Sequence, residues 1–164
     1  MNAMAPTRPT ELSDRRVRLA TGPAAAGEAR GQVRAAICTW DVPVDPDVAV
    51  LLTSELVTNA IMHEASGTIT LVISCSCDQL RVEVHDTSCF MPVLVDAPAD
   101  AETGRGLMLV GALSDGWGSY RTPVGKAVYF MLAFRPGLGP GRRPAGVAHV
   151  GTVSRESSVV RRIH

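Results

Sequence analysis

The chain has 164 residues, of which 46% are hydrophobic and 20% are charged, and its formal net charge is zero. This composition predicts one soluble globular domain with a proper hydrophobic core. The neutral charge and the aromatic content of 4% disfavour direct binding to nucleic acid. Neither a membrane-spanning apolar run nor a signal-peptide core is evident, so we expect a cytoplasmic protein that does not bind a membrane.

The first part of the chain predicts an arm, a strand and a helix. Residues 1–14 mix proline, threonine and charged residues without a period, and we expect a flexible N-terminal arm. Arg16–Ala20 alternates polar and apolar residues, as short edge strands do. Ala24–Trp40 has apolar residues at the spacing of an amphipathic helix.

A second helix carries the most informative polar residues. Asp45 followed by Pro46 predicts its start, because this pair suits a helix cap and first turn, and the helix ends near residues 66–67. Glu55 and Asn59 are four residues apart and therefore share one face, within an apolar surround. Such a pair is either a satisfied polar network or a site for Mg²⁺ and a nucleophile, because hard cations prefer oxygen ligands.

The middle of the chain predicts a β-hairpin followed by a loop. Thr68–Cys75 and Gln79–Asp86 both alternate with a period of two, and a short turn separates them. Each strand therefore offers one apolar face to a helical layer. On the second strand, Arg81, Glu83 and His85 fall on the other face. Residues 87–103 have no period, and long loops of this kind are often functional lids or mobile segments.

The last part of the domain predicts one helix and two strands. Residues 104–106 (GRG) open a short apolar helix, and Gly116–Arg121 and Lys126–Phe134 form strands around a turn. We expect Lys126 to be a solvated lysine. Residues 136–164 are rich in glycine and proline and have no core pattern, so we expect a disordered tail.

Residues 15–135 thus predict an α/β (α+β) domain. Its expected architecture is a two-layer sandwich, in which three helices cover one face of a mixed, mostly antiparallel sheet.

Three motifs carry a resemblance to a known family. They are ELVTNAIMH at Glu55–His63, VEVHDTS at Val82–Ser88 and GRGLMLV at Gly104–Val110. Their order resembles the ATP-binding domain of the GHKL superfamily, which has a histidine kinase-like, Bergerat-type fold. The resemblance covers residues 16–134 and is closest to the small bacterial branch of anti-sigma-factor serine/threonine kinases.

The resemblance implies a role for individual residues. Asn59 corresponds to the Mg²⁺-binding asparagine and Glu55 to the catalytic residue that acts as general base or orients the attacking hydroxyl. Asp86 corresponds to the aspartate that reads adenine. Ser88 stands where the family usually has glycine; serine can donate a hydrogen bond but does not readily adopt a positive φ.

The glycine motif is implied to bind the phosphates of ATP through Gly104, Arg105, Gly106 and Leu107. Glycines let backbone N–H groups approach closely, and the start of a helix adds positive potential. Arg105 is a candidate contact of the γ-phosphate. For His63, a ligand contact and a partly buried polar position remain open alternatives.

The implied function is that of an ATP- and Mg²⁺-dependent regulatory protein. It would phosphorylate an anti-anti-sigma antagonist of the STAS type and sequester a sigma factor. Two alternatives stay open, namely a nucleotide-gated protein-binding module without kinase activity and a scaffold that no longer binds nucleotide. The sequence also leaves open whether the protein forms a homodimer.

Overall fold

The computed structural model describes residues 12–92 and 105–135. Its helices and strands follow in the order β1 (Ser13–Ala20), α1 (Ala25–Thr39), α2 (Pro46–His63), β2 (Thr68–Cys75), β3 (Gln79–Asp86), α3 (Arg105–Leu113), β4 (Gly116–Thr122) and β5 (Gly125–Ala133). Every predicted helix and strand is therefore present. β1 begins at Ser13, so the last two residues of the predicted arm belong to a strand. Residues 1–11 of the predicted arm, residues 93–104 and the predicted tail lie outside the described residues.

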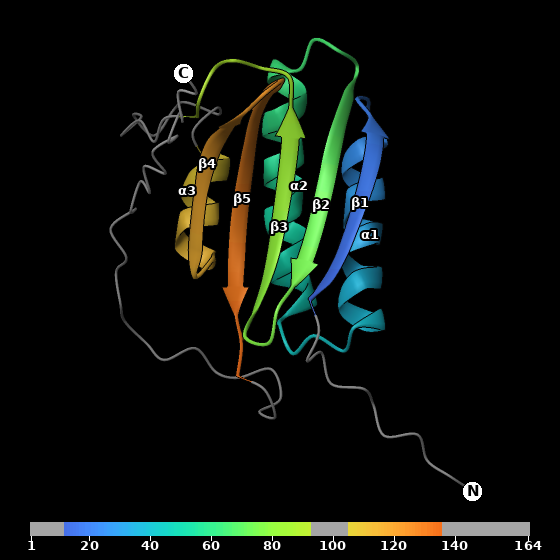
Figure 1. Ribbon diagram of the computed structural model, residues 1–164, viewed down its shortest axis with the longest axis vertical. Helices are drawn as coiled ribbons and strands as arrows, with labels where there is room; N and C mark the ends of the chain where they lie inside the picture. Colours follow the sequence, from blue (N-terminus) through green and yellow to red (C-terminus); the bar gives the residue numbers. More distant parts are fainter. Residues whose placement is uncertain (1–11, 93–104, 136–164) are drawn as a thin grey trace, which may run out of the picture.

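The strands form one open sheet in the order β1-β2-β3-β5-β4, and the three helices cover one of its faces (Figure 1). This is the predicted two-layer α+β architecture. All four pairings are antiparallel, so the parallel component of the expected mixed sheet is absent from the described residues. For β1 and β2 the reason is the path of the chain between them. The helices α1 and α2 run in opposite directions (Figure 1), so the chain returns to the end where β1 finished, and Ala20 pairs with Thr68.

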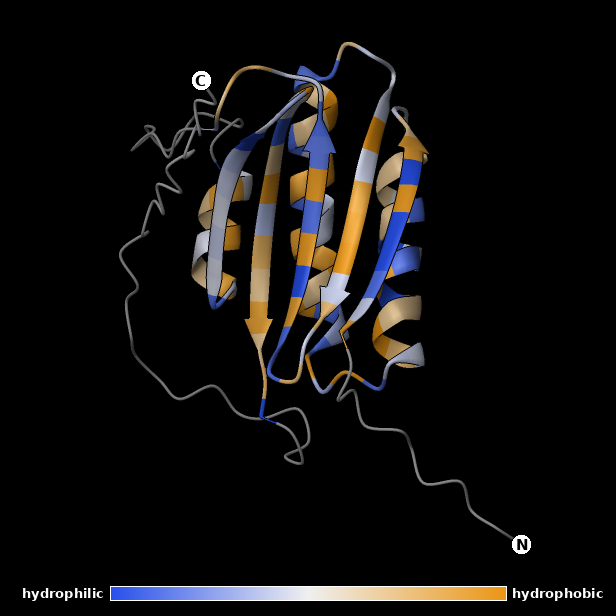
Figure 2. Cartoon of the chain, viewed as in Figure 1, coloured by the Kyte–Doolittle hydropathy of each residue, from blue (hydrophilic) through white to orange (hydrophobic). Residues whose placement is uncertain are grey.

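Alternation along the strands creates the core. In β2 and β3, buried residues alternate regularly with half-buried ones. Figure 2 shows the same alternation of hydrophobic and hydrophilic residues along β3. The buried face of the sheet packs against the apolar sides of α1 and α2, and the cluster includes Val33, Leu52, Leu56, Ile73, Val82 and Phe130.

The start of α2 has the predicted cap. Asp45 Oδ1 accepts hydrogen bonds from the backbone N–H groups of Asp47 at 2.9 Å and Val48 at 3.4 Å, and Pro46 occupies the first helical position. These bonds satisfy N–H groups that have no partner inside the helix. The helix ends at His63, a few residues before the expected turn, and His63 is exposed rather than partly buried.

The face of the sheet that the described helices leave uncovered carries a polar network around Glu83. Arg81, Glu83 and His85 lie on this face, as predicted. The Glu83 carboxylate accepts hydrogen bonds from Arg81 Nε and from the Tyr120 hydroxyl, the latter at 2.6 Å, and Oε2 lies 2.9 Å from His85 Nε2. Burial alone would raise the pKa of Glu83, but these hydrogen bonds and the charge of Arg81 outweigh burial and lower the pKa to about 2.

None of the helices within residues 12–92 and 105–135 is long and apolar enough to cross a membrane.

Candidate functional site

Several chain segments meet at one end of the domain. β3 ends at Asp86, which lies opposite Lys126 at the beginning of β5 in the antiparallel register. The C-terminal end of α2 reaches the same place, because the Glu64 side chain accepts a hydrogen bond from the backbone N–H of Thr87 at 2.7 Å. Figure 1 shows these ends together at the top of the view. Residues far apart in the sequence thereby form one polar region beside the helical layer.

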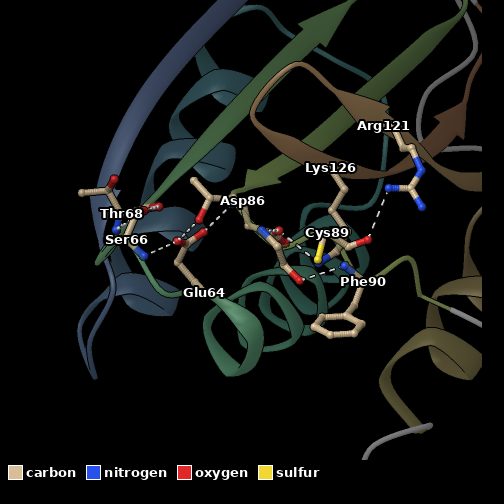
Figure 3. A network of polar contacts seen from close by, with 10 residues as sticks. Glu64, Ser66, Thr68, Asp86, Cys89, Phe90, Arg121 and Lys126 are labelled. Carbon is tan, nitrogen blue, oxygen red and sulfur yellow. Dashed lines mark hydrogen bonds and ion pairs between the residues drawn. The ribbon is translucent and has the colours of Figure 1, made fainter.

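Asp86 is a buried carboxylate with one unused oxygen. Its Oδ1 accepts hydrogen bonds from the backbone N–H of Ser88 at 2.8 Å and from Lys126 Nζ at 3.0 Å (Figure 3). Its Oδ2 is buried and has no hydrogen-bond partner among the described residues. Leaving a buried polar atom unpaired costs about 1–3 kcal/mol, so an oxygen of this kind calls for an explanation. It suits a ligand that donates an N–H group, as the exocyclic amine of adenine does.

Lys126 does not have the solvated position expected from the sequence. It is 1% exposed, and its ammonium group forms an ion pair with the equally buried side chain of Asp86. Alternation explains the difference, because Lys126 lies on the same face of β5 as Val128 and Phe130, which belong to the core. That parity is a signal from which its inward position could have been predicted.

Glu64 joins the end of α2 to the segment that follows Asp86. Its carboxylate accepts hydrogen bonds from the backbone N–H of Ser66 and from both the N–H and the hydroxyl of Thr87 (Figure 3). Burial alone would raise the pKa of Glu64, but the hydrogen bonds from Ser66 and Thr87 outweigh burial and lower the pKa to about 2. Glu64 was not among the predicted site residues, since a contact between positions 64 and 87 leaves no local pattern in the sequence.

The predicted catalytic residue, Glu55, lies at the other end of the site. Its half-buried carboxylate is packed against the first turn of α3, where a Cβ atom on Gly106 would lie only 2.5 Å from Glu55 Oε2. Within the described residues the carboxylate has no hydrogen-bond donor. The absence of a side chain at Gly106 therefore leaves room for a carboxylate that is free to accept a proton or to orient a hydroxyl group.

Asn59 lies between the two ends of the site. It is half-buried on α2, one turn beyond Glu55, so the two side chains share a helix face. With a rise of about 1.5 Å per residue, Glu55 and Glu64 are about 13 Å apart along the helix. A ligand that contacts both Asp86 and Gly106 must therefore be elongated, and a nucleoside triphosphate has that shape.

The fit to Mg²⁺ rests on the amide oxygen of Asn59. The described residues contain no cluster of three His, Cys, Asp or Glu side chains that could hold a metal ion by themselves. A single amide oxygen suits Mg²⁺, which usually takes its remaining ligands from phosphates and water. These residues therefore fit a cation that arrives together with a triphosphate.

The other predicted contacts have mixed positions. Ser88 is buried, and its hydroxyl accepts a hydrogen bond from the backbone N–H of Phe90 at 3.2 Å. Its φ is not positive, since Asp41 is the only described non-glycine residue with a positive φ, so serine is accommodated there without strain. Arg105 is exposed at the first position of α3, while the Leu107 side chain is buried in the core, which leaves its backbone for ligand contacts.

Gly104, the remaining predicted phosphate contact, lies outside the described residues. A further cation that the prediction did not include is near the site: Arg121 Nη1 donates a hydrogen bond to the carbonyl of Cys89 at 3.4 Å (Figure 3). The structure thus groups Asp86, Ser88 and Lys126 at one end and Glu55 with Gly106 at the other, with Asn59 on the helix that joins them.

Comparison with known proteins agrees with this geometry. No curated protein matches the chain. Residues 18–132, which include all the residues of the site, match the family described as the histidine kinase-like ATPase domain. The match spans well over half of the chain and implies that the domain binds ATP. The chain therefore belongs to the histidine kinase-like ATPase domain family.

Proposed function

We propose that this protein is a serine/threonine protein kinase of the anti-sigma-factor type. In this role it phosphorylates an anti-anti-sigma antagonist of the STAS type and, in its other complex, sequesters a sigma factor. The observation that carries the proposal is the half-buried Glu55 carboxylate, which has no hydrogen-bond donor within the described residues and lies against Gly106. A carboxylate in this position can take the proton of an attacking hydroxyl group, which the transfer of a phosphoryl group to serine requires.

The proposed substrate lies along α2. The buried Asp86 Oδ2 accepts a hydrogen bond from the exocyclic amine of adenine, which gives this oxygen the partner it lacks among the described residues. The triphosphate extends toward the first turn of α3, where backbone N–H groups and the helix dipole favour negative charge. Asn59 would hold Mg²⁺, which would supply charge neutralisation for the phosphate oxygens.

Glu55 then serves the transfer step. A serine hydroxyl of the partner protein attacks the γ-phosphorus, and its proton passes to the Glu55 carboxylate as the new O–P bond forms. The bond between the γ-phosphorus and the bridging oxygen breaks, and ADP leaves with that oxygen. Because the transition state is largely loose, most of the acceleration comes from holding the hydroxyl in line with the breaking bond.

The test is phosphoryl transfer from labelled ATP to a serine of an antagonist protein in the presence of Mg²⁺. We expect Glu55→Gln, which keeps the shape of the side chain but cannot take the proton, to slow transfer by at least about 100-fold. ATP affinity should change little in this variant. Glu28→Gln is the matched control, because Glu28 is an exposed glutamate in the first turn of α1.

Transfer at the wild-type rate in Glu55→Gln would remove Glu55 from the mechanism. If the wild type binds ATP and its affinity for a sigma factor changes with the nucleotide, but no antagonist is phosphorylated, the protein is the nucleotide-gated binding module instead of a kinase.

A further inference from the structure

We propose that Lys126 is a second base-contacting residue, which donates a hydrogen bond to the ring nitrogen N1 of adenine beside the amine that Asp86 accepts. This inference rests on the ATP binding described above and deepens it. It starts from two unused hydrogen-bonding capacities that lie next to each other in the buried part of the site.

The first unused capacity belongs to Asp86. Of its two carboxylate oxygens, Oδ1 has two donors, whereas the buried Oδ2 has none among the described residues. The second belongs to Lys126, whose ammonium group carries three N–H donors. One of them is used by Asp86 Oδ1, and within the part of the chain that the structure describes no other acceptor contacts Nζ. At 1% exposure, the remaining donors are not satisfied by bulk water.

A charge-balancing role alone does not explain this arrangement. Burial of an ion pair is tolerated when the remaining lone pairs and protons are also hydrogen-bonded, and within residues 12–92 and 105–135 they have no such partners. Both the acceptor Oδ2 and the spare donors of Nζ adjoin the same atom, Asp86 Oδ1. The site therefore offers an acceptor and a donor side by side.

The fold fixes this juxtaposition. Gly125 precedes Lys126, and a Cβ atom at Gly125 would lie 2.0 Å from the carbonyl oxygen of Asp86 and 2.6 Å from the Cα of Thr87. These are backbone atoms that cannot move aside as a flexible side chain could. Only glycine permits the two strands to approach so closely, and the close approach keeps Lys126 in register opposite Asp86.

The ligand chemistry follows from this pair of groups. On its Watson–Crick edge, adenine presents the N–H donor of the exocyclic amine beside the acceptor N1. In the proposed orientation the amine binds Asp86 Oδ2 and N1 lies towards Lys126 Nζ, which is next to the other oxygen of the same carboxylate. One buried ion pair then reads two adjacent atoms of the base, and the unused acceptor and one spare donor become satisfied.

The test compares ATP with two analogues in which a single ring nitrogen is replaced by C–H. In 1-deaza-ATP the replaced atom is N1, and in 7-deaza-ATP it is N7 on another edge; both keep the amine and the triphosphate. We expect the wild type to bind 1-deaza-ATP about 10- to 100-fold more weakly than 7-deaza-ATP, because a hydrogen bond from a charged donor is lost. Binding is measured by titration calorimetry with Mg²⁺.

Lys126→Met supplies the second arm. In this variant the two analogues should bind with equal affinity. If Lys126 had only a structural role, the variant would keep the difference in affinity between them. The wild-type comparison stands even if the variant does not fold. If the wild type binds both analogues equally, the role of Lys126 is overturned but the ATP site stands. The same holds if Lys126→Met still binds 1-deaza-ATP more weakly than 7-deaza-ATP. Failure of the wild type to bind ATP at all overturns the proposed function and this inference together.

Discussion

Replacing Lys126 by methionine should destabilise the domain strongly. The ion pair with Asp86 is 3.0 Å long, and the side chains are 1% and 0% exposed, respectively. Removing one partner of a buried pair leaves an uncompensated charge, which costs about 3–5 kcal/mol. Whole domains have a free energy of unfolding of about 5–15 kcal/mol, so this loss is a large fraction of the total. The Lys126→Met variant should therefore unfold at a much lower urea concentration than the wild type.

The assay is equilibrium unfolding in urea, followed by far-ultraviolet circular dichroism and extrapolated linearly to water. Arg18→Met is the matched control, because it removes one positive charge from an exposed strand position and should change stability by less than about 0.5 kcal/mol. The double variant Asp86→Leu/Lys126→Met should recover most of the loss, since neither charge remains buried. A loss below about 1 kcal/mol in Lys126→Met would refute the burial of this ion pair.

Three further predictions concern Gly106, Gly125 and the hydrogen bonds that join Glu64 to Thr87. Gly106→Ala should displace the Glu55 carboxylate, since the new Cβ would lie 2.5 Å from Oε2, and should reduce phosphoryl transfer at least about tenfold in a kinase assay while the thermal midpoint stays within a few degrees. Gly125→Ala should lower the free energy of unfolding by about 1–3 kcal/mol or more in urea, because its Cβ meets the rigid backbone at Asp86. Glu64→Gln should lower the thermal midpoint at pH 7. Since the folded-state pKa of Glu64 is lowered to about 2, this contribution is complete above pH 4.5 and should fade as the pH falls from 4.5 towards 2. Parallel melting curves of wild type and Glu64→Gln that keep a constant separation down to pH 2 would contradict this account of Glu64.

The sequence was sufficient to predict local structure. Asp45 and Pro46 mark the start of α2 because capping depends on residues adjacent in the chain. The period of two in β2 and β3 predicted both the hairpin and the face that each residue occupies. The positions of Glu55 and Asn59 on one face of α2 likewise follow from helical spacing alone.

Long-range contacts of polar residues were the part that the sequence could not provide. The alternation along β5 could have placed Lys126 inward, but lysine is rarely buried and we expected it in solvent; its ion pair with Asp86 across the strands, which makes burial tolerable, left no local pattern. The hydrogen bonds from Thr87 to Glu64 depend on where α2 ends relative to β3, and no local sequence pattern encodes that position. Ser88 was a further open question, and the observed backbone answers it, since its φ does not require glycine.

The central claim is that ATP binds with its base at Asp86 and its phosphates near Gly106. Titration calorimetry of Mg²⁺·ATP into the wild type and into Asp86→Asn tests it most directly, with the exposed Asp14→Asn as the control. The account predicts saturable binding to the wild type and to Asp14→Asn, and affinity at least about tenfold lower in Asp86→Asn, because the buried Oδ2 loses its charge. No binding to the wild type, or equal affinity in Asp86→Asn, would contradict it.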